Sequence, residues 1–348
     1  MTRAVKHFDL HQVAGIELRV VSDVEDGVLG VIDAEDCVVR RYVERGLWRH
    51  SWVDLFILQD LQSLAQQLAE VGDLPPGGSQ AVDRRPVMNA YDLADLSGCH
   101  VFVNRRVMVE EGYWSDPAAL RALLAHEHAH PLSENQTTRA SRRLRLVTAT
   151  GREEAENTTS GSVSLFTLAG LLADKLCCYA PREIFANEFA ITGGFAEDLF
   201  HLDQRVMAAA ARGVLARGEL VRHVETEVTE GRLSAAKAEQ MLLVGDLRGY
   251  LDLALETVPF HRAGRSDQAA MLEQVLFEHV FPRLGPELEG IYRAVCGLYA
   301  ELGPDLTGPA LASWGRRVLE LLAGLLQERG LELALSLDYS EDEEGRDA

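Results

Sequence analysis

Residues 126–130 place two histidines four positions apart, with a glutamate directly after the first. The segment reads His-Glu-His-Ala-His, so His126, Glu127 and His130 form an H-E-x-x-H pattern. On an α-helix His126 and His130 lie on one face, one turn apart, where both imidazoles can bind one zinc ion. Glu127 then lies beside the metal and can accept a proton from a zinc-bound water. The pattern therefore predicts the zinc site and the general base of a metallohydrolase.

His128 lies between the two predicted ligands. On a helix it points away from them, so we do not expect it to bind the same ion. On a strand His128 and His130 would share a face as an H-x-H pair, but the preceding residues favour a helix. A chance match in a helix that carries three histidines is the remaining alternative.

The residues before the motif predict the helix that it needs. Ser115 or Asp116 can cap this helix, Pro117 suits its first turn, and the leucine-rich segment that follows supplies an apolar face. Pro131 comes directly after His130 and has no backbone N–H. We therefore expect the helix to end or kink there.

A catalytic zinc site needs a third protein ligand, and this ligand must come from another segment. Glu183 is the candidate, because it and Asn187 share a helix face in the segment Glu-Ile-Phe-Ala-Asn-Glu-Phe-Ala, residues 183–190. We expect Glu183 to bind the metal while the Asn187 amide hydrogen-bonds a ligand histidine. Glu188 is the alternative ligand, and a solvated acid at a helix start is the alternative role for Glu183.

Hydrolysis also needs a donor that stabilises the oxyanion, a contribution on the order of 3 kcal/mol. The motif itself contains no such donor. His201 is the preferred candidate, because it follows the segment with Glu183 by about the length of a helix and a turn. Tyr179 and His223 are the alternatives, and a structural role is open for all three.

These residues resemble the site of the gluzincin metallopeptidases, in which two histidines and a downstream glutamate hold zinc. The approach to the motif is similar to that of the peptidases related to the heat-shock and prenyl-protein membrane proteases. It runs through Met-Asn-Ala-Tyr at 88–91, Gly-Cys-His-Val-Phe-Val-Asn at 98–104 and Leu-Leu-Ala-His-Glu at 123–127. The segment 183–190 is instead most similar to the ImmA/IrrE regulatory peptidases. The resemblance extends over residues 86–200.

The resemblance implies a zincin-like catalytic domain of the α+β class that binds Zn²⁺ and acts as a metalloendopeptidase on peptides or proteins. It also implies that strand 101–104 is the edge of the catalytic sheet, where an extended peptide binds. Two residues depart from the family pattern: Asn187 replaces an aspartate, and Pro131 interrupts a helix that commonly continues. They leave open a catalytically idle zinc-binding regulator or scaffold, and a non-peptide metallohydrolase is a third possibility. The base Glu127 argues against an idle site.

Composition limits the partners and the setting. The 348 residues carry 34 basic and 54 acidic side chains, a net charge of −20, which disfavours nucleic acid or an anionic membrane as partner. Residues 1–9 lack the apolar core of a signal peptide, and we expect no membrane span. Five cysteines without framework spacing favour reduced thiols in the cytoplasm. The oligomeric state is not predicted.

We expect four regions along the chain. Residues 1–75 form strands and a helix of the catalytic unit, 76–204 the catalytic core, 205–336 a helical subdomain, and 337–348 an acidic disordered tail. Within the first region, the β-branched runs at 16–21, 28–32 and 37–42 predict strands, and the leucines of 53–71 predict a helix.

Two further segments separate the predicted ligands. Residues 132–162 are polar and predict a surface loop with a short helix, either a lid or an ordinary insertion. Residues 163–178 are apolar at helical spacing, and they predict a buried helix that is too short and too interrupted by charge to span a membrane. In the helical subdomain, Ser234 is the predicted cap of a helix over 234–243.

Overall fold

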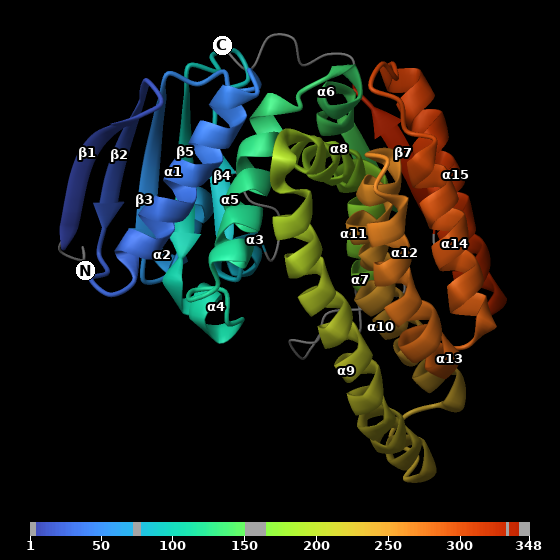
Figure 1. The fold of residues 1–348 in the computed structure, drawn as a ribbon. Helices are drawn as coiled ribbons and strands as arrows, with labels where there is room; N and C mark the ends of the chain where they lie inside the picture. The colour runs from blue at the N-terminus through green and yellow to red at the C-terminus, as the bar shows by residue number, and fades with distance from the viewer. Residues whose placement is uncertain (1–4, 72–77, 150–164, 332–333, 341–348) are drawn as a thin grey trace. The chain divides into compact units, whose positions relative to one another are not determined.

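The computed structural model of the protein describes residues 5–71, 78–149, 165–331 and 334–340 (Figure 1). This part of the chain is a mixture of helices and strands, so the predicted α+β class is confirmed. The chain divides into two compact units. The first unit contains residues 1–133 and 189–202, and the second contains residues 134–188 and 203–348. The sequence-based division at residues 75, 204 and 336 is a different partition and stays a prediction.

The first unit is built on a five-stranded mixed sheet with the strand order β1-β2-β3-β5-β4. Strands β2, β3 and β5 are parallel, while β1 and β4 are antiparallel edge strands. The five strands are β1 His7–Val13, β2 Ile16–Ser22, β3 Trp52–Leu58, β4 Val87–Ala90 and β5 Gly98–Asn104.

Alternating burial shows how the strands of this sheet pack. In β3, Val53, Leu55 and Ile57 are fully buried, and the residues between them are only half-buried. Helices α1 Val28–Glu44 and α5 Pro117–Leu132 contact each other (Figure 1). Helices α2 Gln62–Val71 and α3 Gly78–Asp83 form a smaller apolar cluster with residues that include Phe102 of β5. Helix α4, Arg105–Glu110, follows β5.

The second unit is mostly helical, with one two-stranded antiparallel sheet of β6 Leu144–Ala149 and β7 Ala334–Tyr339. Its helices are α6 Gln136–Arg142, α7 Leu165–Asp174, α8 Ala180–Ala190, α9 Ala196–Thr229, α10 Ala235–Tyr250, α11 Ala254–Arg262, α12 Ser266–Val275, α13 Phe281–Leu284, α14 Pro286–Ala300 and α15 Gly308–Glu328. Short π-helical segments join several of them: Lys175–Tyr179, Ile191–Phe195 and Leu276–Val280. The helices α8 and α9 each extend across a boundary between the units.

Several predictions about the second unit can be compared with this fold. The helical C-terminal region is confirmed, and Ser234 caps α10 by accepting a hydrogen bond from the backbone N–H of Lys237. The apolar stretch 163–178 is helical from Leu165 onwards, as predicted. The loop predicted at 132–162 contains the short helix that was predicted, α6. It also contains strand β6, which was not predicted. Residues 337–339, predicted to belong to a disordered tail, are instead part of strand β7, which pairs with β6. Residues 150–162 of the predicted loop and residues 341–348 of the predicted tail lie outside the described part of the chain.

Three predictions in the first unit are wrong. The runs 28–32 and 37–42 are not strands but parts of the single helix α1. The residues 53–71 are not one helix, because β3 takes the first six of them and α2 begins at Gln62. Strand β5, which contains residues 101–104, is not the sheet edge, because β4 pairs with its outer side.

Within the described ranges, no helix combines the length and the apolar character that crossing a bilayer would need.

Candidate active site

Helix α5 carries the whole H-E-x-x-H pattern, which confirms the predicted helix and excludes the strand arrangement of His128 and His130. The imidazole rings of His126 and His130 lie on one face, with centroids 4.7 Å apart and planes at 81°. Both rings are half-buried, whereas Glu127 is 7% exposed. Two imidazoles that face the same space at this separation fit a zinc ion, which binds histidine nitrogen at about 2.0–2.1 Å.

The start of α5 forms as its sequence predicts. Asp116 is the N-cap, and its carboxylate accepts hydrogen bonds of 3.1 Å from the backbone N–H groups of Ala118 and Ala119. Pro117 occupies the first turn, where its missing N–H removes no helical hydrogen bond.

The end of α5 also follows from its sequence. The helix continues through Pro131 for one residue and ends at Leu132. Pro131 has no N–H for the carbonyl of Glu127, four residues earlier. The side-chain amide of Asn89, from edge strand β4, donates a hydrogen bond to that carbonyl instead. Asn89 therefore fixes the backbone of the predicted base against the sheet edge.

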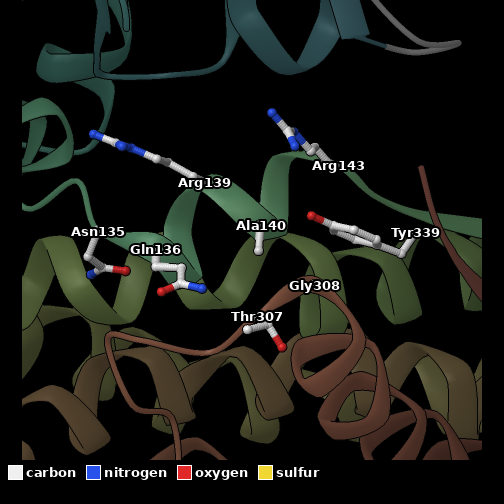
Figure 2. Close-up of a pocket in the computed structure, with 8 residues that line it drawn as sticks. All are labelled: Asn135, Gln136, Arg139, Ala140, Arg143, Thr307, Gly308 and Tyr339. Atoms are coloured by element: carbon white, nitrogen blue, oxygen red, sulfur yellow. The ribbon is translucent and has the colours of Figure 1, made fainter. Parts of the chain in front are cut away.

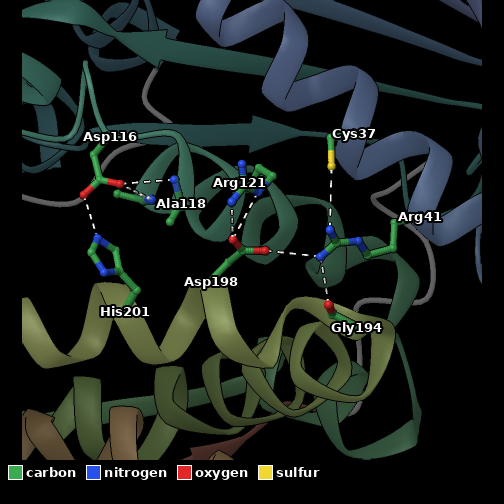
Figure 3. Close-up of polar contacts among 9 residues, drawn as sticks. Cys37, Arg41, Asp116, Ala118, Arg121, Gly194, Asp198 and His201 are labelled. Carbon is green, nitrogen blue, oxygen red and sulfur yellow. Dashed lines mark hydrogen bonds and ion pairs between the residues drawn. The ribbon is translucent and has the colours of Figure 1, made fainter.

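Further contacts within the first unit hold α5 in place, and Figure 3 shows those of Asp198. The hydroxyl of Tyr42, on α1, donates to the carbonyl of Ala125 at 2.9 Å. The nearly buried carboxylate of Asp198 accepts hydrogen bonds from Arg121 of α5 at 2.6 Å and from Arg41 of α1 at 3.2 Å. These contacts position α5 at Arg121 and Ala125, within the five residues before the motif.

His128 points to the other side of α5, as predicted. Its side chain is fully buried, and its Nε2 lies 2.6 Å from Oε1 of the buried Glu35 on α1. Burial lowers the pKa of His128, but the negative charge of Glu35 and the hydrogen bonds with Cys99 and Glu35 together outweigh it and raise the pKa to about 10. His50 lies nearby, and its own burial together with the positive charge of His128 lowers its pKa to about 4. The structure therefore gives His128 a buried acidic partner.

The predicted third ligand lies in the second unit. Glu183 is in the first turn of α8, and Asn187 lies one turn further along the same helix. The Asn187 amide donates to the carbonyl of Leu255 at 3.1 Å, and the alternative ligand Glu188 forms a 2.8 Å ion pair with Arg262. The metal ligation by Glu183 and the contact of Asn187 with a ligand histidine stay predictions.

His201 occupies a position that argues against its predicted role. Its Nε2 lies 2.7 Å from the carboxylate of Asp116, the N-cap of α5 (Figure 3). Asp116 precedes His126 by ten residues, which at about 1.5 Å per residue is about 15 Å along the helix axis. An oxyanion donor must lie beside the reacting carbonyl, so His201 is not part of the site that we propose. The alternatives Tyr179 and His223 stay predictions.

The edge of the sheet lies at β4 rather than at β5. Strand β4 pairs with β5 on one side and contacts α5. The correction moves the predicted peptide-binding edge from residues 101–104 to residues 87–90 of the same sheet.

The sequence analysis did not predict the roles of two residues that support the motif. Glu35 is the partner of His128, and Asn89 bonds the backbone of Glu127. Glu35 is 93 positions from His128, and it lies between the two runs, 28–32 and 37–42, that were predicted to be strands. The available signal was the helical spacing of Val28, Val31 and Ile32, which places Glu35 on their buried face.

A hollow of about 620 Å³ lies in the second unit (Figure 2). Arg139 and Arg143 line it together with Thr307 and Tyr339. None of the predicted ligands, nor the predicted base, is among its lining residues.

Comparison with known proteins points to a class of enzyme. Residues 58–186 match the family model of Peptidase family M48. The matched segment contains the helix with His126, Glu127 and His130 and extends past Glu183. This match supports a zinc metallopeptidase, a hydrolase that acts on peptide or protein substrates. No curated protein and no solved structure matches the chain.

Proposed function

We propose that the protein is a zinc-dependent endopeptidase of the gluzincin type, in which His126, His130 and Glu183 hold the metal and Glu127 is the general base. The observation that carries this proposal is the placement of His126 and His130 on one face of α5, with ring centroids 4.7 Å apart. Glu127 lies between them in sequence. The match to Peptidase family M48 supports the same chemistry.

The donor set fits zinc, because two imidazoles and one carboxylate leave an open position, as in catalytic zinc sites. When bound, the ion would lower the pKa of water and polarise the substrate carbonyl. Glu127 would accept a proton from the attacking water and pass it to the leaving amine. The Asn89 contact and the contacts of Tyr42 and Arg121 keep the backbone of α5 fixed while this proton moves.

The substrate would bind as an extended strand beside β4. The edge of a sheet offers backbone N–H and C=O groups to a peptide without requiring one sequence, which suits an endopeptidase. Strand β4 is the edge that contacts α5, and its Asn89 already bonds the backbone of Glu127. A cytoplasmic setting is part of this proposal, because the spacing of the five cysteines matches no disulfide framework.

Zinc content of purified variants tests the ligand set. We expect Glu183→Ala to contain one zinc ion fewer per chain than the wild type and to lose the cleavage of an unfolded protein such as casein. Glu188→Ala is the matched control, because Glu188 lies on the same helix and is paired with Arg262. Equal zinc content in Glu183→Ala and the wild type would reject Glu183 as a ligand, and zinc loss in Glu188→Ala alone would transfer the role to Glu188.

A further inference from the structure

A second group of metal-binding side chains lies in the interior of the first unit. It consists of His50, just before β3, Cys99 in β5 and His128 on α5. One ligand atom of each residue lies within 4.8 Å of those of the other two. All three side chains are buried, with exposed fractions of 2%, 0% and 0%.

Each imidazole of this group has one nitrogen occupied and one left over. The Nδ1 of His50 lies 2.7 Å from the carbonyl of Leu96, so it carries a proton and donates to that oxygen. The Nε2 of His128 is held by Glu35 at 2.6 Å. The remaining atoms, His50 Nε2 and His128 Nδ1, are buried and make no hydrogen bond of good geometry among the described residues. The Cys99 thiol, a weak hydrogen-bonding group, is the polar side chain that interacts with His128 on this side.

Two buried nitrogens without a strong hydrogen-bond partner in one place require an explanation, because buried polar groups in folded proteins are nearly always well hydrogen-bonded. A bound metal ion would explain both nitrogens, because it accepts a lone pair from each ring and from the sulfur of Cys99. The outer contacts agree with this: ligand histidines usually donate their second N–H to a backbone carbonyl or a carboxylate, as His50 does to Leu96 and His128 to Glu35.

We propose that His50, Cys99 and His128 bind a buried zinc ion, distinct from the one held by the H-E-x-x-H motif. The ligand atoms would be Nε2 of His50, Sγ of Cys99 and Nδ1 of His128. Zinc bonds to nitrogen and sulfur are about 2.0–2.3 Å long, so a small inward movement of the three side chains closes the site.

Charge balance favours a divalent ion. The Cys99 thiolate and the Glu35 carboxylate carry one negative charge each, and both imidazoles are neutral when they bind metal. A 2+ ion therefore leaves the buried site neutral, whereas copper(I) would leave an uncompensated negative charge. The protons displaced from the ligands pass to solvent.

The ion would join three elements of the first unit. Cys99 belongs to β5, His50 precedes the neighbouring strand β3, and His128 belongs to the helix that carries the catalytic motif. The ring of Trp48 packs on both imidazoles, with centroid distances of 5.2 Å to His50 and 4.9 Å to His128, and covers them. The metal would thus fix the rotation of α5 about its axis, and with it the direction of His126 and His130.

Cobalt(II) substitution of the metal-free full-length protein tests this proposal. A thiolate bound to cobalt gives a near-ultraviolet charge-transfer band, which a site of two histidines and a glutamate cannot produce. We expect the wild type to show this band, and Cys99→Ser and His50→Gln to lose it. Cys177→Ser should keep the band, because Cys177 is an equally buried cysteine of the second unit.

His126→Ala separates this proposal from the peptidase site. This variant should keep the charge-transfer band and lose the zinc ion of the H-E-x-x-H motif. Cys99→Ser should instead lose the zinc ion of the second site and keep the one at the motif. Circular dichroism of each variant shows that it is folded. The absence of the band in the wild type, or its persistence in Cys99→Ser, would overturn the second site. Either result would leave the zinc at His126 and His130 untouched.

Discussion

Neighbouring residues of α5 face different surroundings, and this separates their roles. His126 and His130 share the half-buried face, while His128 is enclosed and bonded to Glu35. Side chains on a helix change direction by about 100° per residue, so three histidines within five positions cannot serve one centre. The spacing alone predicted this separation.

His201 gives a prediction at this scale. Because it bonds the N-cap Asp116, about 15 Å along α5 from His126, we expect His201→Ala to change the rate of casein cleavage only a few-fold. Loss of a true oxyanion donor would reduce the rate about 10²–10³-fold. A loss of that size, in a variant with normal zinc content and stability, would restore His201 to the catalytic group.

Asp203, buried in α9, gives a second prediction. Burial and the neighbouring carboxylate of Glu256 raise the pKa of Asp203 well above its usual value. The folded state therefore holds a proton that the unfolded state releases above its pKa of about 3.8, so this residue's contribution to stability falls as the pH rises from there through the folded-state pKa. We expect Asp203→Asn to be more stable than the wild type at neutral pH.

Chemical unfolding at about pH 5 and about pH 8 measures this effect. The gain in the free energy of unfolding of Asp203→Asn over the wild type should be larger at the higher pH. Asp305→Asn replaces an exposed carboxylate and is the control, for which no such increase is expected. A gain for Asp203→Asn that is the same at both pH values would contradict the raised pKa.

At the scale of elements, Pro131 and Asn89 form a compensating pair. Pro131 removes the N–H that would bond the carbonyl of Glu127, and Asn89 of β4 supplies a donor. We expect Asn89→Ala to lower the free energy of unfolding by about 1–3 kcal/mol. In a Pro131→Ala background the loss should be smaller, because an alanine at that position provides a backbone N–H again.

A double-mutant cycle of these two substitutions, followed by chemical unfolding, measures their coupling. Equal losses for Asn89→Ala in both backgrounds would show that the amide does not substitute for the missing donor.

The elements also show what the sequence could and could not predict. The start of α5 was predictable, because Asp116 and Pro117 determine it locally. Helix α1 was mistaken for strands, because its valines favour extended structure, although their spacing of three and four residues is helical. The strand β4 was not identified as the edge, because strand order depends on pairing between distant segments.

At the scale of the whole molecule, the two units have segments that alternate along the chain. The first unit consists of two separate segments, because residues 189–202 belong to it although residues 134–188 belong to the second unit. The ends of helices do not mark residues 188 and 202, because α8 and α9 continue across these two boundaries. Local sequence patterns therefore predicted the motif and the helical region. They did not predict the division into two units, because each unit combines segments that are distant in sequence.

The central claim is that Glu127 acts as a base at a zinc site, and cleavage by Glu127→Gln at matched zinc content tests it most directly. We predict that this variant binds as much zinc as the wild type and cleaves casein about 10²–10⁴-fold more slowly, because the glutamine cannot accept a proton. Cleavage by Glu127→Gln at the wild-type rate, with equal zinc, would contradict the account.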